Sequence, residues 1–313
     1  MLVRVLDGVD AFLDQLGSVA FLPLALAIGC HLLKMACTSR AWRNVLAAAY
    51  PEERVPWISI YGAYLAGVGI NAIIPARAGD AVRIVLAHRA IPGSTYTTVV
   101  SSTLVLSLFD MLAASALLTW ALAMGELPGL DVLPRLRSFD FAWLFARPLL
   151  FELLVAGILV GIGVVAFWIA GHVADFRERV AQAFRVLSPP TRYLRRVAVW
   201  QAADWGLRLL TIWFLLAAFH IPQTLENAAL VQVSTSVATL LPITPAGVGT
   251  EQAFLLYVLS GVASASVLLA FSVGAKLTLT ITNVVAGFTA IALTLRTVRF
   301  KKALHIPEAD AAP

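Results

Sequence analysis

The most constraining feature of this sequence is a series of apolar stretches, each long enough to cross a lipid bilayer. Crossing about 30 Å of hydrocarbon as a helix takes roughly 20 residues. We find eight such stretches, with approximate bounds 18–38, 57–75, 96–124, 149–171, 197–219, 225–243, 252–272 and 275–296. Because lipid offers the backbone no hydrogen-bond partner, they predict an all-α, polytopic membrane bundle of about eight spans.

Composition supports a membrane protein and excludes several other classes. Only 13% of the 313 residues are charged and 60% are hydrophobic, whereas a soluble domain has about 25% charged residues. The net charge of +5 does not indicate a nucleic-acid partner, since the basic residues cluster between and after the apolar stretches, as in cytoplasmic loops. Cys30 and Cys37 lie within one stretch, where helical geometry prevents a disulfide, so we interpret them as packing residues.

The basic residues also predict the orientation. With eight spans, segments 76–94 and 172–196 and the tail after residue 296 fall on one side, which carries most of the basic residues. The loops on the other side carry Arg40, Arg43, Arg54, Arg135, Arg137 and Arg147. We therefore expect a bacterial cytoplasmic membrane protein with both termini in the cytoplasm.

The chain is interpreted as one integral membrane domain over residues 1–313, with two related halves at about 1–125 and 149–296. Its tail, 297–313, is basic and then acidic, and we expect no separate soluble domain. Segment 172–187 has apolar residues at helical spacing and arginines on its other faces. This pattern predicts an amphipathic helix on the cytoplasmic leaflet. A solvated connector is the alternative.

The sequence lacks several motifs that are typical of enzymes. There is no phosphate-binding G-x-x-x-x-G-K-[ST] loop and no G-x-S-x-G elbow, and the five histidines are scattered singly. No closely spaced aspartates offer ligands for a metal-bound diphosphate. We therefore expect no enzymatic activity, no cofactor and no metal. A transferase would rest only on buried acids.

Two interrupted helices, at 71–83 and 240–251, are the strongest pointers to function. The residues that break them are Pro75, Gly79, Pro242, Gly247 and Gly249. Irregular backbone at membrane depth persists only where it is buried in protein or lines a polar cavity. Matching breaks in two halves are typical of the central site of a transporter. The alternative is a pair of ordinary loops at the membrane surface.

Polar residues crowd the first break. Asn71, Arg77, Asp80 and Arg83 lie within it. The two planar guanidinium groups suit bidentate binding of a lipid phosphate. Asp80 would orient one of them or cap the following helix.

Other charges lie deeper in the apolar stretches. Asp110 is near the centre of the third stretch, Asp204 and Arg208 are four residues apart in the fifth, and Glu251 and Lys276 follow the second break. A charge at such depth costs on the order of 3 kcal/mol on insertion scales, so these residues should face the bundle interior and form a polar path. For Asp204 and Arg208, an internal ion pair that lowers the insertion cost is the alternative.

The first break, N-A-I-I-P-A-R-A-G-D-A-V-R, resembles the hallmark N-x-x-L-P-x-R-x-G-E-x-x-R of the lysylphosphatidylglycerol synthase transmembrane-region family, also called the flippase-like domain family. Segment 241–251 resembles its P-G-G-x-G-x-x-E motif, and residues 40–43, R-A-W-R, resemble its R-W-R element. Three departures occur: Asp80 replaces Glu, residues 106–107 lack a frequent Glu-Arg pair, and Lys276 replaces a frequent Arg. The resemblance covers nearly the whole chain.

The resemblance implies the flippase half of a synthase without its soluble aminoacyl-transferase domain. The implied function is ATP-independent translocation of a membrane lipid, either an anionic or aminoacylated phospholipid or an isoprenoid- or hopanoid-type lipid. In this hypothesis Arg77 and Arg83 receive the headgroup. The alternative is a non-transporting scaffold or regulator that docks a lipid-modifying enzyme on segment 172–187.

Overall fold

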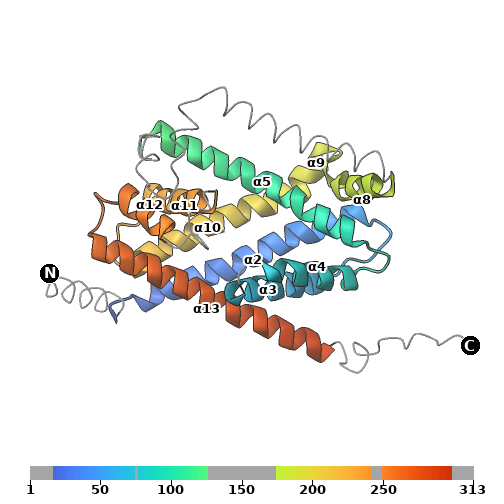
Figure 1. The fold of residues 1–313 in the computed structure, drawn as a ribbon, viewed down its shortest axis with the longest axis horizontal. Helices are drawn as coiled ribbons and strands as arrows, with labels where there is room; N and C mark the ends of the chain where they lie inside the picture. Colours follow the sequence, from blue (N-terminus) through green and yellow to red (C-terminus); the bar gives the residue numbers. More distant parts are fainter. Residues whose placement is uncertain (1–16, 75–76, 126–173, 241–248, 298–313) are drawn as a thin grey trace, which may run out of the picture.

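The computed structural model describes residues 17–74, 77–125, 174–240 and 249–297. Within these ranges the ordered elements are helices and no strand occurs, which confirms the predicted all-α class. The longest helices run along the long axis of the molecule (Figure 1). The first half consists of α2 (Phe21–Ala49), α3 (Trp57–Ile73), α4 (Ala78–Ala90) and α5 (Tyr96–Ala123).

In the second half, short helical segments precede another set of four helices. They are α8 (Ala174–Phe184), η2 (Arg185–Leu187), α9 (Pro190–Tyr193) and η3 (Leu194–Ala198). The π-helical turn η3 joins α9 to the next helix without a break. The remaining helices are α10 (Val199–Ala218), α11 (Leu225–Leu240), α12 (Thr250–Val258) and α13 (Ala265–Thr297).

Helices α3 and α4 form an antiparallel hairpin that enters and leaves the bundle at one end. With 13 residues, α4 extends only about 20 Å, less than the hydrocarbon thickness. The start of the hairpin is tied to the end of α2, because Arg43 Nε donates to the Val55 carbonyl at 2.9 Å. After the hairpin the chain comes back to the end of α2, because Thr95 N donates to the Tyr50 hydroxyl at 2.9 Å. Both ends of this hairpin therefore lie at the same end of the bundle.

Helices α11 and α12 form a second short hairpin, which enters from the other end of the bundle. They have 16 and nine residues, and the Thr235 hydroxyl donates to Glu251 Oε1 at 3.1 Å between them. Ile221, before α11, and Leu259, after α12, are buried in one apolar cluster with Phe219 at the end of α10. The two ends of this hairpin thus lie together as well.

Three contacts show that α2 and α10 are antiparallel. Ala20 N donates to the Ala218 carbonyl at 2.9 Å, Thr38 Oγ1 to Asp204 Oδ1 at 2.6 Å, and Asn44 Nδ2 to the Arg196 carbonyl at 2.6 Å. Residue numbers thus rise along α2 as they fall along α10. The two hairpins thus enter from opposite ends, an inverted arrangement of the two halves of the described chain.

Glycines let α3 pack closely between α4 and α13. A Cβ on Gly67 would lie 2.8 Å from the Gly79 carbonyl oxygen, and a Cβ on Gly69 would lie 2.7 Å from the Gly287 Cα. Small residues at such crossings allow helix backbones in a membrane to approach one another. The first hairpin is therefore held against the last long helix.

Arginines gather at one end of the bundle, which we call the basic end. This is the end where α2 finishes and α5 begins, and α8 packs there because Gln182 Nε2 donates to the Ala49 carbonyl at 2.9 Å. Its arginines are Arg40, Arg43, Arg54, Arg89, Arg179, Arg185, Arg192, Arg195 and Arg196. Near the other end, the described residues 17–30, 112–125, 210–230 and 253–270 contain no Lys or Arg.

The helices differ from the predicted spans in several places. Three helices among the described residues are long and apolar enough to cross a membrane, namely Phe21–Ala49, Tyr96–Ala123 and Ala265–Leu293. The predicted span 252–272 is wrong, because α12 ends at Val258 and α13 begins only at Ala265. Stretch 149–171 lies outside the described residues.

The predicted sidedness of the first loop is wrong. Arg40 and Arg43 lie inside α2, at the same end as segment 172–196, whereas the sequence places them on the opposite side. Helix α2 begins and helix α13 ends at opposite ends of the bundle (Figure 1). The chain termini, residues 1–16 and 298–313, lie outside the described residues, so the expectation of both termini in the cytoplasm stays a prediction.

Candidate functional site

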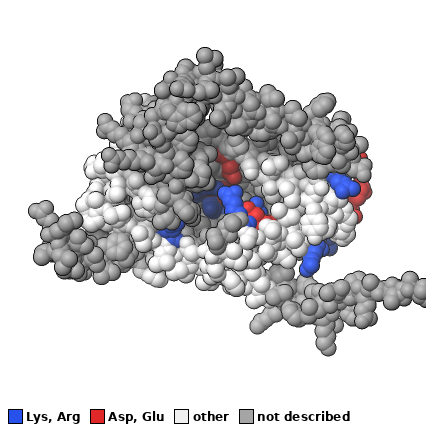
Figure 2. Space-filling model, in the orientation of Figure 1, with Lys and Arg blue, Asp and Glu red and all other residues white. Residues whose placement is uncertain are grey.

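A cavity of about 470 Å³ lies midway along the long helices, where α2 meets α10–α13. Its charged lining residues are Lys34, Arg208, Glu251 and Lys276, from four different helices. The uncharged polar lining consists of His31, Thr211, Gln232, Thr235, Ser272, Thr280 and Asn283. Figure 2 shows basic and acidic side chains gathered in a hollow near the middle of this face.

The three cations of the cavity have different partners. An Arg208 terminal nitrogen (Nη2) lies 3.1 Å from Asp204 Oδ2, and Lys276 Nζ lies 3.1 Å from Glu251 Oε2. Within the described part of the chain, Lys34 Nζ has neither a hydrogen bond nor an ion pair. The antiparallel register of α2 and α10 places Lys34 level with Arg208. The positive charges of Lys34 and Arg208 therefore face the same cavity. Between α2 and α10 one carboxylate, that of Asp204, contacts both helices.

Asp204 is that carboxylate, and it lies behind the cavity wall. It is 3% exposed and accepts a hydrogen bond from Thr38 Oγ1 besides pairing with Arg208. A buried carboxylate requires such partners. The Arg208 guanidinium also lies 4.6 Å from the centre of the Trp205 ring. Asp204 thus fixes the position of Arg208 at the wall.

Asp110 does not line the cavity. Its Oδ1 accepts a hydrogen bond of 2.8 Å from Trp205 Nε1, while Gln201 Nε2 donates to the Leu106 carbonyl at 2.8 Å. Both contacts join α5 to α10. The structure therefore gives Asp110 a role in helix packing next to the cavity.

Glu251 links three helices at the cavity wall. Its Oε1 accepts from Thr235 of α11 and its Oε2 pairs with Lys276 of α13, while Glu251 itself opens α12. Gly249 has φ +92°, a conformation that favours glycine. Three residues later, Gln252 Oε1 accepts a hydrogen bond from Gly249 N at 2.6 Å. The Nε2 of the same side chain donates to Ser272 Oγ of α13 at 3.1 Å. Side chains thus hold the start of α12 in place.

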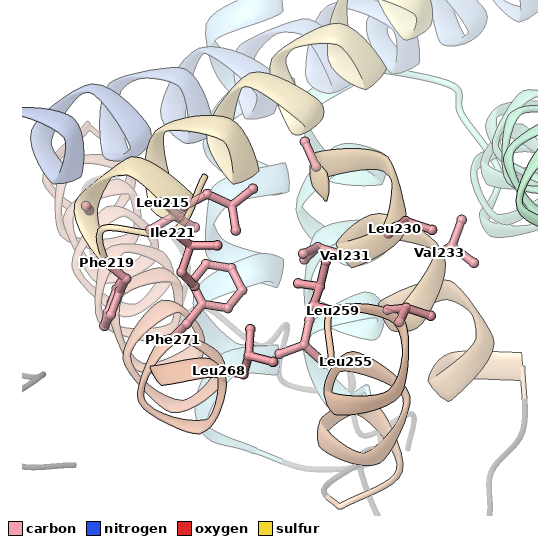
Figure 3. Close-up of a cluster of buried hydrophobic side chains, with 14 of the residues drawn as sticks. Leu215, Phe219, Ile221, Leu230, Val231, Val233, Leu255, Leu259, Leu268 and Phe271 are labelled. Atoms are coloured by element: carbon pink, nitrogen blue, oxygen red, sulfur yellow. The ribbon is translucent and has the colours of Figure 1, made fainter. Parts of the chain in front are cut away.

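An apolar cluster borders the cavity on the side away from the basic end. Leu215, Val231, Leu255 and Phe271 line the cavity and also belong to this cluster. Figure 3 shows these side chains converging from α10, α11, α12 and α13. The cavity therefore has one wall that carries charge and another that is apolar.

The residues of the first break form a separate cluster between α3 and α4. Asn71 Oδ1 accepts from Gly79 N at 2.8 Å, and Asn71 Nδ2 donates to Asp80 Oδ1 at 2.9 Å. Arg83 Nε lies 3.5 Å from the same Asp80 oxygen, and its guanidinium lies 5.8 Å from the Trp42 ring centre. Arg77 is exposed, with φ +58°. These residues do not line the cavity.

The R-A-W-R element belongs to the same packing system. Trp42 is buried and its Nε1 donates to Ser102 Oγ at 2.8 Å, while the Arg40 guanidinium lies 5.5 Å from the ring centre of Trp57. These contacts join α2 to α5 and to α3. The element therefore holds helices together at the basic end.

Among the sequence candidates, the structure brings Arg208, Glu251 and Lys276 to the cavity, with Asp204 directly behind. Pro75, Pro242 and Gly247 lie outside the described residues. Sequence reasoning missed Lys34 and His31, whose Nε2 is 2.8 Å from Asn283 Oδ1 across α2 and α13. The available signal was the lysine within the first apolar stretch, because an ionisable residue within a membrane span indicates a functional site.

Comparison with known families identifies the family of this chain. The family described as the lysylphosphatidylglycerol synthase TM region matches residues 1–287. The chain belongs to this family. It is thus a membrane domain of a kind associated with lipid handling. A comparison with curated proteins found no match. Among the described residues of this family member, no group of three or more His, Cys, Asp or Glu could hold a metal.

Proposed function

We propose that the chain is an ATP-independent lipid translocator of a bacterial cytoplasmic membrane, in which a phosphate-bearing headgroup passes through the cavity while its tails stay in lipid. The observation that carries this proposal is the meeting of Lys34, Arg208 and Lys276 around one cavity halfway along the bundle. Cations at this depth are costly in a membrane protein, so they mark a polar path.

The chemistry of the lining suits a lipid headgroup. Arginine and lysine are the usual partners of phosphate oxygens. Hydroxyl and amide groups such as Thr211, Gln232 and Asn283 can replace the water lost by the headgroup. The apolar wall at Leu215 and Phe271 suits the glycerol or acyl region next to a phosphate.

The inverted arrangement of the two hairpins supports movement between the two membrane faces. In transporters built from inverted repeats, the site lies near the midplane and the repeats move around it. Here the cavity meets α11 and α12 of one hairpin, while α13 contacts the other through Gly69 and Gly287. A rocking motion of either hairpin would change access to the cavity.

Arg77 and Arg83 have unequal places in this proposal. Arg83 is engaged by Asp80 and packs against Trp42, so we assign it to the structure of the hairpin. Arg77 is exposed and has no ion pair within the described residues. We propose it as an outer contact for the headgroup, outside the cavity.

A proteoliposome assay with fluorescent phospholipids of several headgroups tests the function, with quenching of the exposed leaflet as the readout. Lys34→Met removes the unpartnered cation, and we expect it to slow movement at least about tenfold, the effect of losing about 1.4 kcal/mol of binding. The matched control is Arg89→Met, an exposed position at the basic end, which should keep the wild-type rate. Thermal unfolding in detergent verifies that both variants fold.

Two outcomes would contradict the proposal. Folded wild-type protein that moves no lipid would favour the scaffold hypothesis, in which α8 docks a lipid-modifying enzyme. In that case the exposed face with Arg179 and Arg185 would form the docking surface, because Ala183 is buried against the bundle. Movement by Lys34→Met at the wild-type rate would show that the cavity is not the path.

A further inference from the structure

The start of α12 is held to the rest of the bundle by polar contacts at the cavity. Lys276 binds Glu251, and Ser272, one turn earlier on α13, accepts from Gln252. A nine-residue helix is marginal by itself. The position of α12 therefore depends on these contacts and on its apolar face, where Leu255 and Val258 are buried.

The ion pair between Lys276 and Glu251 is well placed for exchange. The Lys276 side chain is 42% exposed and that of Glu251 is 23% exposed, both next to the cavity. Partly exposed ion pairs contribute little net free energy. Phosphate oxygens form charge-assisted hydrogen bonds of comparable strength with lysine, so an anion in the cavity can compete with Glu251.

Lys34 supplies the reason for an anion to enter. It faces the cavity level with Arg208 and forms no hydrogen bond or ion pair among the described residues, since the carboxylates of Asp204 and Asp110 act on it only from a longer distance. Two neighbouring cations repel one another at close range. A phosphate group between them would relieve that repulsion, and it would share the cavity with Lys276.

We infer that Glu251 is an exchangeable counter-ion: a phosphate group in the cavity replaces it as the partner of Lys276 and releases the start of α12 from α13. This inference deepens the proposed function and rests on it for the lipid ligand, although the exchange needs only a phosphate anion. Occupancy of the cavity is thereby coupled to the mobility of the second hairpin. The released Glu251 keeps its hydrogen bond from Thr235 on α11.

Hydrogen–deuterium exchange of the α12 peptide, in purified full-length protein in detergent, tests the inference. The probe is dihexanoyl phosphatidylglycerol, with inorganic phosphate as a second arm and dihexanoylglycerol as the phosphate-free control. We expect the probe to speed exchange in α12 about tenfold through loss of local protection, and dihexanoylglycerol to have no effect. If inorganic phosphate also speeds exchange in α12, the cavity is a site for phosphate in general. If only the lipid speeds exchange, the cavity is a site for the lipid headgroup.

Variants separate release from binding. Glu251→Gln should show fast α12 exchange without any probe, whereas the matched control Glu226→Gln, at an exposed position on α11, should exchange like wild type. Lys34→Met should keep slow basal exchange and lose the response to the probe. Slow exchange in Glu251→Gln, or no response of wild type to either anion, would overturn the inference.

The outcome is independent of the transport assay. An exchange response in a protein that moves no lipid would remove the proposed function and leave the ion-pair exchange standing. Lipid movement by a protein whose α12 exchange does not respond to either anion would keep the proposed function and overturn the ion-pair exchange.

Discussion

Individual polar residues in this protein serve either packing or the cavity, and their partners show which. Asp110 binds Trp205 and Asp80 binds Asn71, so each joins two helices. Lys34 has no such partner within the described ranges. A charge that is costly at this depth and forms neither a hydrogen bond nor an ion pair requires another explanation. Ligand binding supplies one.

Gly79 gives a test of the packing role of the first break. Gly79→Ala would place a Cβ against the Gly67 carbonyl oxygen and near Asn71. We expect a loss of about 1–3 kcal/mol of stability, typical of overpacking. The measurement is thermal unfolding in detergent, compared with Gly206→Ala on α10, where a Cβ meets no atom within 4 Å.

The control should be neutral or slightly stabilising, since alanine favours a helix over glycine by about 1 kcal/mol. Equal stability of Gly79→Ala and wild type would show that α3 and α4 do not approach as closely as the structure indicates. The hallmark motif would then need a role other than packing.

At the scale of elements, the sequence predicts where helices break but not where they go next. Proline and glycine identify both breaks, because each acts on the local backbone. Whether the following helix crosses the membrane or returns depends on contacts such as Arg43 to Val55, which join distant residues. The false span 252–272 arose because Ser260, Gly261 and Ser264 are small and lower the apolar character of the stretch only slightly.

The sequence likewise predicts which residues of the candidate site are conspicuous, but not which of them meet in the fold. Arg208, Glu251 and Lys276 stand out as charges in apolar stretches, and all three line the cavity. Asp80 and Arg83 of the first break were equally conspicuous, but they pair with one another and with Asn71 between α3 and α4. Nothing local distinguishes the two cases. The antiparallel pairing of α2 with α10, which brings Lys34 to Arg208, is a property of the tertiary fold.

The amphipathic helix α8 is the element whose attachment is most easily tested. Gln182 Nε2 donates to the Ala49 carbonyl, and Thr98 Oγ1 donates to the Arg179 carbonyl at 3.1 Å. We expect Gln182→Ala to loosen α8, because it leaves the Ala49 carbonyl without this donor. Limited trypsin digestion should then cleave at Arg179 or Arg185 several-fold faster, as local opening permits.

Gln223→Ala, at an exposed position before α11, is the matched control and should leave the digestion pattern unchanged. The rest of the bundle should resist trypsin in both variants. Unaltered cleavage of Gln182→Ala would mean that the apolar contacts of Ala183 and Val186 hold α8 without the hydrogen bond.

At the scale of the whole molecule, the basic end determines the orientation. The basic end brings together Arg89 and the segments 40–54 and 179–196. The described parts of the opposite end contain no Lys or Arg. Arginine and lysine are retained on the cytoplasmic side of membrane proteins. The asymmetry is stronger in the folded bundle than in the sequence, because Arg40, Arg43 and Arg54, which a count of spans assigns to the opposite side, lie at the basic end.

This orientation leads to a prediction about accessibility on the two sides of the membrane. In a background with Cys30 and Cys37 replaced by Ser, Arg185→Cys and Ser264→Cys introduce single thiols at two exposed positions at opposite ends. Because we expect the basic end to face the cytoplasm, a membrane-impermeant maleimide should label Ser264→Cys in spheroplasts and Arg185→Cys only in inside-out vesicles. Labelling of both thiols from the same side would contradict the inverted arrangement of the halves, whereas the reverse pattern would preserve it and invert the orientation.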